Sequence, residues 1–277
     1  AAPDKFPEGL QECVRRMKEE YGVWKVGVWH AVMGYWNGLK AGSEAEKRLR
    51  EGSIKLPDGR KIPAAQGGGA FRFYSIWHKY LKNTCVIDFV KVDGQSAISL
   101  FYEGLKEYGS ASAAIQEGLN ASAALHFDNN IINCMGMAPE DMWNRPSSAV
   151  ARSSDDFVPE APHGFWEHAL QNGYNSLLQG QFFWGDWDMF WSSHAERRQN
   201  AVLRAVSGGP VYTSDPVGKT DPELILPLIR KDGTVIRCDN VGMHTLDCLF
   251  ENAAESGRML KLFNHYGEAY VVAAFSM

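Results

Sequence analysis

Segments typical of strands and helices alternate along most of this chain, and this order limits the available folds more than any other feature. The clearest strand is the apolar run 85–92, which suits a strand covered on both faces of a parallel sheet. Helices are predicted at 7–21, 71–81, 110–125, 165–178, 195–206 and 222–230, and strands at 23–29, 85–92, 131–135, from 149, 181–183 and 210–213. Repeated strand-then-helix units predict an α/β fold with crossover helices.

Polar and aromatic residues follow one predicted strand after another, which distinguishes between the two folds built from such units. They occur at Trp29 and His30, at Asp93, at Asn133 and Cys134, at Asp155 and Asp156, at Asp186 and Asp188, and at Asp215. A barrel gathers functional residues at the carboxyl ends of all its strands, whereas a doubly wound sheet concentrates them at one switch point. The pattern favours a (β/α)8 TIM barrel. Because six units are visible and the first element is a helix, we expect the first two βα units to be lacking.

The pattern changes near the carboxyl end, where strands follow one another without helices. Residues 234–237, 259–263 and 270–275 are predicted to be strands joined by turns. We therefore assign 1–232 to a partial catalytic barrel that holds barrel strands 3–8. Residues 233–277 are assigned to the beginning of a carboxyl-terminal β-sandwich domain that is cut off at its end.

Composition excludes several classes of partner and cofactor. The net charge of −5 argues against a nucleic-acid or acidic-membrane partner, and no apolar run is long enough to cross a bilayer. The five cysteines are odd in number and form no CxxC pair, which favours a reducing, cytoplasmic location over a disulfide framework or a zinc site. His30 has no second ligand at metal-binding spacing, so we expect no metal and no other cofactor. The oligomeric state stays open.

Two acidic positions are the best candidates for chemistry. Lys91 and Asp93 point to the same side of their strand, and a neighbouring lysine favours an ionised carboxylate, which suits a nucleophile. Capping of the following helix is an equally good explanation of Asp93. In the pair Asp155 and Asp156, repulsion raises the pKa of one carboxyl group, as a general acid requires, although a polar loop would have the same sequence. Two carboxylates with aromatic neighbours and no cofactor signature favour glycoside chemistry.

Five segments, taken in order, resemble glycoside hydrolase family 36. The resemblance is to its branch of raffinose synthases, seed imbibition proteins and alkaline α-galactosidases, and the segments are residues 28–36, 90–93, 152–157, 186–190 and 205–215. It implies that Asp93 is the nucleophile. It also implies that Asp156, four residues after the sugar-binding Arg152, is the acid/base rather than Asp155. The further residues that the resemblance places at the sugar or beside it are Lys91, Trp29, Asn133, Cys134, Asp155 and Asp188.

This resemblance implies a retaining α-galactosidase that hydrolyses raffinose-family oligosaccharides through a galactosyl-enzyme. The alternatives are a raffinose-synthase-like transferase that moves galactose from galactinol to sucrose, and a catalytically incomplete fragment. The short segment 158–165 after Asp156 favours hydrolysis. Expected ligands are raffinose, stachyose, melibiose and galactinol. Because two galactose-binding motifs of the family and its amino-terminal β domain are not found, we expect the isolated 277 residues to be inactive and poorly stable.

Overall fold

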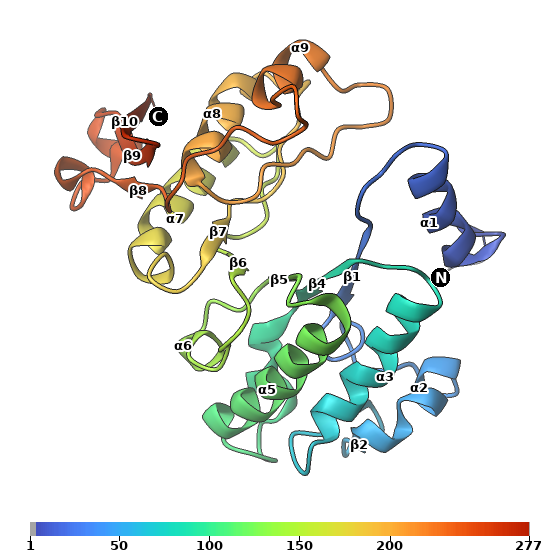
Figure 1. Ribbon diagram of the computed structural model, residues 1–277. Helices are drawn as coiled ribbons and strands as arrows, with labels where there is room; N and C mark the ends of the chain where they lie inside the picture. Colours follow the sequence, from blue (N-terminus) through green and yellow to red (C-terminus); the bar gives the residue numbers. More distant parts are fainter. Residues whose placement is uncertain (1–3, 277) are drawn as a thin grey trace. The chain divides into compact units, whose positions relative to one another are not determined.

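The computed structural model describes residues 4–276, which divide into two compact units between Ser148 and Ala149. Each unit combines parallel strands with helices (Figure 1), so the predicted α/β class is confirmed. The barrel and the domain boundary at residue 232 stay predictions. No helix among residues 4–276 is both long and apolar enough to cross a membrane.

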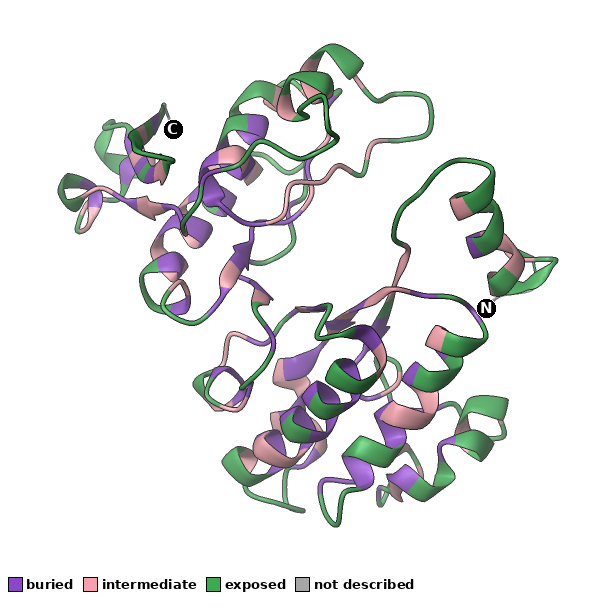
Figure 2. Ribbon diagram, viewed as in Figure 1, coloured by how far each residue is buried: buried purple, intermediate pink, exposed green. Residues whose placement is uncertain are grey.

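The first unit is built on three parallel strands that lie in the order β1 (Gly27–Ala31), β4 (Phe89–Asp93) and β5 (Ile131–Asn133). Two long helices, α3 (Gly69–Asn83) and α5 (Tyr108–Phe127), pack side by side (Figure 1). Their buried faces join the strands in one hydrophobic core, and their outer faces are exposed (Figure 2). The helices predicted at 71–81 and 110–125 correspond to α3 and α5, each of which extends a few residues further.

The two faces of β4 differ, and this difference positions the site. Val90 and Val92 are fully buried and belong to the core formed with α3 and α5. Lys91 and Asp93 alternate with them, so they point to the opposite, less buried face. The remaining elements of this unit are α1 (Gly9–Glu19), α2 (Glu44–Arg48), η1 (Arg50–Gly52), the antiparallel pair β2 (Ser53–Lys55) and β3 (Lys61–Pro63), η2 (Gln95–Ala97), α4 (Ile98–Phe101) and α6 (Pro139–Met142).

The second unit contains the parallel pair β6 (Val150–Arg152) and β7 (Trp184–Asp186), with the helices α7 (Gly164–Gln179) and α8 (Arg197–Ser207). Near the carboxyl end a three-stranded antiparallel sheet has the order β10 (Ala269–Phe275), β9 (Leu260–Tyr266) and β8 (Met243–His244). Phe165, Trp187 and Leu262 belong to a core that this sheet shares with the helices. The other elements are α9 (Pro222–Ile225), η3 (Leu226–Leu228), η4 (Leu246–Cys248) and α10 (Ala253–Ser256).

Several predicted strands differ from the structure. The runs predicted at 23–29 and 85–92 form strands only from Gly27 and Phe89 onward, as β1 and β4. The strand expected at 181–183 begins only at Trp184, because the three preceding residues close the turn after α7. Residues 210–213 contribute a single parallel bridge, Phe190 to Thr213. Residues 234–237, all described, form no strand: Val235 makes one antiparallel bridge, and the apolar side chains of this segment stay largely exposed. A short run with β-branched residues does not form a strand where no neighbouring strand pairs with it.

A chain of buried hydrogen bonds ties β1 to both helices of the first unit. His30 Nδ1 lies 3.1 Å from the carbonyl oxygen of Ala31, and its Nε2 lies 3.1 Å from His78 Nε2. His78 Nδ1 is 2.8 Å from Ser122 Oγ. Because a carbonyl only accepts, His30 donates through Nδ1; with His30 neutral, His78 donates to His30 and Ser122 donates to His78. This direction requires both imidazoles to be neutral.

Low pH should therefore destabilise this unit. Burial lowers the pKa of His30 to about 4 and holds the pKa of His78 well below its usual range. A histidine with a lowered folded-state pKa stabilises the fold fully above its unfolded pKa, and this stabilisation is lost as pH falls from about 6.5 towards the folded value. We expect the opening free energy of β1 and α3 to be roughly 2 kcal/mol lower at pH 5.0 than at pH 7.5 from His30 alone.

Amide hydrogen exchange, corrected for intrinsic rates, measures this difference. His30→Gln removes one of the two titrating groups, so its opening free energy should depend less steeply on pH. An equally steep dependence in His30→Gln would contradict the assignment.

Candidate active site

The carboxyl ends of β1 and β4 bring together three residues expected from the sequence. In the parallel register Trp29 lies opposite Lys91 and Ala31 lies opposite Asp93, so all four point away from the face that α3 and α5 cover. Trp29 Nε1 donates to Asp93 Oδ2 at 2.9 Å, and the backbone N–H of Gly94 donates to Asp93 Oδ1 at 2.6 Å. Both oxygens of Asp93 therefore act as acceptors, as those of an ionised carboxylate do.

The expected pairing of Lys91 with Asp93 is not found among residues 4–276, where the ion pairs within 4.0 Å do not join these two side chains. Donors from an aromatic side chain and from the backbone contact Asp93 instead of the lysine. The short Gly94 contact requires the chain to turn directly after the strand, and Gly94 adopts a left-handed φ of 67° there. Asp93 is thus oriented by an indole N–H and a backbone N–H.

Asn133 lies on the other face of the same sheet. The register places it opposite Val92, and it is almost fully buried. Its Oδ1 accepts a hydrogen bond from Gln95 Nε2 at 2.9 Å. Gln95 Nε2 also donates to the carbonyl oxygen of Val92 at 3.0 Å. Gln95 Oε1 in turn accepts from Gln116 Nε2 at 2.9 Å. Asn133 therefore belongs to a polar cluster beneath α5. The next residue, Cys134, is also buried, and its N–H donates to Val92 O.

Aromatic side chains surround the Trp29 indole on the exposed side. Tyr35 lies edge-on to it with 6.2 Å between ring centroids, and Trp36 is tilted at 5.4 Å. Trp29, Tyr35 and Trp36 are 39%, 61% and 47% exposed, which distinguishes a surface cluster from core packing. Flat, exposed rings beside a carboxylate suit the apolar faces of a sugar ring.

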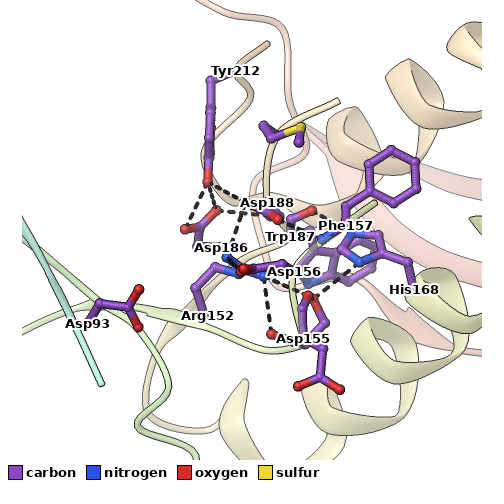
Figure 3. A network of polar contacts seen from close by, with 12 residues as sticks. Asp93, Arg152, Asp155, Asp156, Phe157, His168, Asp186, Trp187, Asp188 and Tyr212 are labelled. Atoms are coloured by element: carbon purple, nitrogen blue, oxygen red, sulfur yellow. Dashed lines mark hydrogen bonds and ion pairs between the residues drawn. The ribbon is translucent and has the colours of Figure 1, made fainter. Parts of the chain in front are cut away.

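In the second unit Arg152, at the end of β6, holds two carboxylates. Its Nη1 lies 3.1 Å from Asp156 Oδ1 and 3.1 Å from Asp188 Oδ1 (Figure 3). Arg152 is 2% exposed, whereas the side chain of Asp156 is 83% exposed. A buried guanidinium therefore holds an accessible carboxylate at a strand end.

Asp155 and Asp156 point in different directions despite being neighbours. Asp155 presents its backbone oxygen to Arg152 Nη2 at 2.6 Å, while its carboxylate is directed towards Gln171 on α7, away from Arg152 (Figure 3). The backbone N–H of Asp155 also donates to Gln171 Oε1 at 2.9 Å. Of these two neighbouring carboxylates, that of Asp156 is the one paired with Arg152.

The buried Asp186 and Asp188 and the partly buried Tyr212 form a polar group beside Arg152. The register of β6 and β7 places Asp186 opposite Arg152. The Tyr212 hydroxyl lies 2.9 Å and 3.1 Å from the two Asp186 oxygens and 3.2 Å from Asp188 Oδ1 (Figure 3). Burial, together with the two carboxylates, raises the pKa of Tyr212 far above its ordinary value, so the hydroxyl stays protonated and donates.

Sequence reasoning missed several residues of this arrangement. Four side chains contact the site through tertiary hydrogen bonds: the buried Gln95, His168 and Arg204, and the partly buried Tyr212. Tyr212 did lie in one of the five matching segments, but nothing in its spacing indicated a contact with Asp186. Among residues 4–276 no group of three or more His, Cys, Asp or Glu side chains has a metal-binding arrangement.

Comparison with known proteins identifies the family. The chain is 35% identical to probable galactinol–sucrose galactosyltransferase 6 of Arabidopsis thaliana over 92% of the chain and 36% of that relative. It is 34% identical to galactinol–sucrose galactosyltransferase of Oryza sativa subsp. japonica over 98% of the chain and 38% of that protein. Stachyose synthase of Pisum sativum is 28% identical, over 98% and 35% respectively. The chain thus spans little more than a third of the length of these curated relatives.

A family model described as raffinose synthase or seed imbibition protein Sip1 matches residues 3–277. This match covers almost the whole chain and confirms the resemblance drawn from the five segments. The chain therefore belongs to the raffinose synthase and seed imbibition protein family.

Proposed function

We propose that this chain supplies the galactosyl-transfer centre of a retaining enzyme that moves galactose from galactinol to a sugar such as sucrose. The observation that carries the proposal is Asp93: an acceptor-only carboxylate at a strand end, hydrogen-bonded through both oxygens and bordered by exposed aromatic rings. The names of the relatives favour transfer between sugars over hydrolysis. The same proposal places the parallel strands in a (β/α)8 barrel, the architecture expected from the sequence.

The mechanism is a double displacement. An oxygen of Asp93 forms a bond to the anomeric carbon of the donor while the bond to the leaving oxygen breaks, and Asp156 gives its proton to that oxygen. In the second step the acceptor hydroxyl attacks the same carbon, its proton passes to Asp156, and the bond to Asp93 breaks. Each step inverts the anomeric carbon, so the α configuration is retained.

Three further side chains have roles in this proposal. Lys91 shares the face of Asp93 and offers donors to sugar hydroxyls, and Trp29 both orients Asp93 and presents a ring. Arg152 holds Asp156 in place. Retention further requires the carboxyl groups of Asp93 and Asp156 to lie about 5–5.5 Å apart in the working enzyme, whereas a separation of about 9 Å would indicate inversion.

Hydrolysis is the competing function. The segment between Phe157 and the start of α7 at Gly164 is short, which is the feature that favoured an α-galactosidase on sequence grounds. Water and a sugar hydroxyl differ only as the acceptor in the second step, so the products distinguish them.

The test is to incubate the intact protein with galactinol, with and without sucrose, and to quantify raffinose and free galactose. Transfer predicts raffinose as the main product and a suppression of free galactose by sucrose. Galactose release at the same rate with and without sucrose, with no raffinose, would instead indicate a hydrolase.

A further inference from the structure

We propose that Arg204 is a positioning residue for the acid/base Asp156 and acts through the turn at Asp188. This inference rests on the proposed function, because it gives a role to a side chain that neither contacts the sugar nor belongs to the expected site. Arg204 lies on α8 and is fully buried. Its hydrogen bonds connect it to Asp156 through three links.

The first link joins Asp156 to Asp188. Asp188 Oδ2 accepts the backbone N–H of Phe157 at 2.8 Å, which fixes the peptide directly after Asp156. Asp188 Oδ1 lies 3.1 Å from the same Arg152 nitrogen that binds the Asp156 carboxylate. Asp188 therefore holds both the backbone of the acid/base residue and the guanidinium that orients its side chain.

The second link is the conformation of Asp188 itself. Its φ is 60°, in the left-handed region that residues other than glycine rarely adopt and that costs on the order of 1 kcal/mol or more. On one side its N–H donates to Asp186 Oδ1 at 3.0 Å. On the other side its carbonyl oxygen accepts from Arg204 Nε at 3.2 Å, and the next carbonyl, that of Met189, accepts from Arg204 Nη2 at 2.8 Å. The planar guanidinium thus spans two successive carbonyls of the strained turn.

The third link is the set of contacts that hold the Arg204 guanidinium in position. Its guanidinium lies 5.1 Å from the ring centroid of Phe157 and 5.6 Å from that of Phe190. Nη1 donates to Asn200 Oδ1 at 2.5 Å, and Nη2 lies 3.0 Å from His168 Nε2. Burial lowers the pKa of Arg204 to about 9 and that of His168 to about 3, so at neutral pH the arginine is charged and the histidine is not.

Charge and shape together make arginine specific at this position. Arg152 and Arg204 offset the charges of the buried Asp186 and Asp188, and a lysine would preserve that balance. A lysine cannot, however, bridge two carbonyls with a planar fork while lying between two rings. Arg204→Lys should therefore release the Asp188 turn without leaving an uncompensated buried charge, which makes it the informative substitution.

The test compares two donors in the intact protein. Galactinol needs its leaving oxygen protonated, whereas a 2,4-dinitrophenyl α-galactoside does not. We expect Arg204→Lys to lower kcat/KM for galactinol by on the order of 10²-fold, the lower end of what general acid catalysis contributes. We expect kcat/KM for the dinitrophenyl donor to fall by less than about tenfold. Arg198→Lys, an exposed position on the same helix, is the control and should leave both values unchanged.

A parallel loss for both donors would overturn the inference, since a merely structural role lowers all activity together. Asp156→Ala is the reference variant: if it shows no such dependence on the leaving group, the proposed role of Asp156 fails rather than the link to Arg204. If Arg204→Lys does not fold by circular dichroism, Asp188→Asn takes its place. That variant weakens the acceptor for Phe157 and must give the same selective loss, and a parallel loss there also contradicts the link.

Discussion

Asp93→Gly is expected to reduce galactosyl transfer from galactinol by about 10⁴-fold or more, because removing a nucleophile from a group that acts as a unit removes most of the catalytic power. The glycine leaves space where the carboxylate lay between the Trp29 indole and the Gly94 amide. Azide can occupy this space and attack the anomeric carbon from the same side. We therefore expect azide to restore turnover and to yield β-galactosyl azide.

Asp93→Asn is the matched control for this result. It also lacks a nucleophilic carboxylate, but its side chain fills the space that azide would need, so it should be inactive and stay inactive when azide is added. Substantial activity of either variant without azide, or an azide product of α configuration, would mean that Asp93 is not the nucleophile.

Asp156→Ala is expected to have the second largest effect. Loss of a general acid and base typically costs 10²- to 10⁴-fold, so kcat/KM for galactinol should fall within that range. Asp155→Ala should remain within a few-fold of the unmodified protein, because the Asp155 carboxylate is directed at Gln171 and not at Arg152. Asp155→Ala is therefore the matched control for Asp156→Ala.

Initial rates with galactinol, measured for both variants, decide between the two residues. A large loss in Asp155→Ala with a small loss in Asp156→Ala would reverse the assignment. Equal losses would indicate that the loop, rather than one carboxylate, had been disturbed.

The sequence predicted those parts of the molecule that local patterns determine. The run 110–125 corresponds to α5 with small shifts at its ends, because apolar periodicity reflects one buried face. The run 85–92 is a strand only from Phe89 onward, as β4. Asp93 and Arg152 were placed at strand ends correctly for the same reason. The strand expected at 234–237 does not form, because no neighbouring strand pairs with this segment beyond one isolated bridge.

The contacts that orient the candidate site could not be read from spacing. Trp29 reaches Asp93 across 64 positions of the chain, and Tyr212 reaches Asp186 across 26. Lys91 was the nearer charge in sequence, yet Trp29 and the Gly94 amide provide the donors to Asp93. Arg204 carried no signal at all, because an arginine on an amphipathic helix is usually solvent-exposed. Such roles depend on tertiary packing, which a single sequence does not specify residue by residue.

The central claim is that galactose passes through a covalent bond to Asp93. The most direct measurement is to incubate the intact protein with a slowly reacting fluorinated α-galactosyl donor, digest it, and locate the added mass by tandem mass spectrometry. We expect one fluorogalactosyl group on the peptide that contains Asp93, and no labelling of Asp93→Gly. A label on any other residue, or an unlabelled protein that converts α-galactosides to β products, would contradict it.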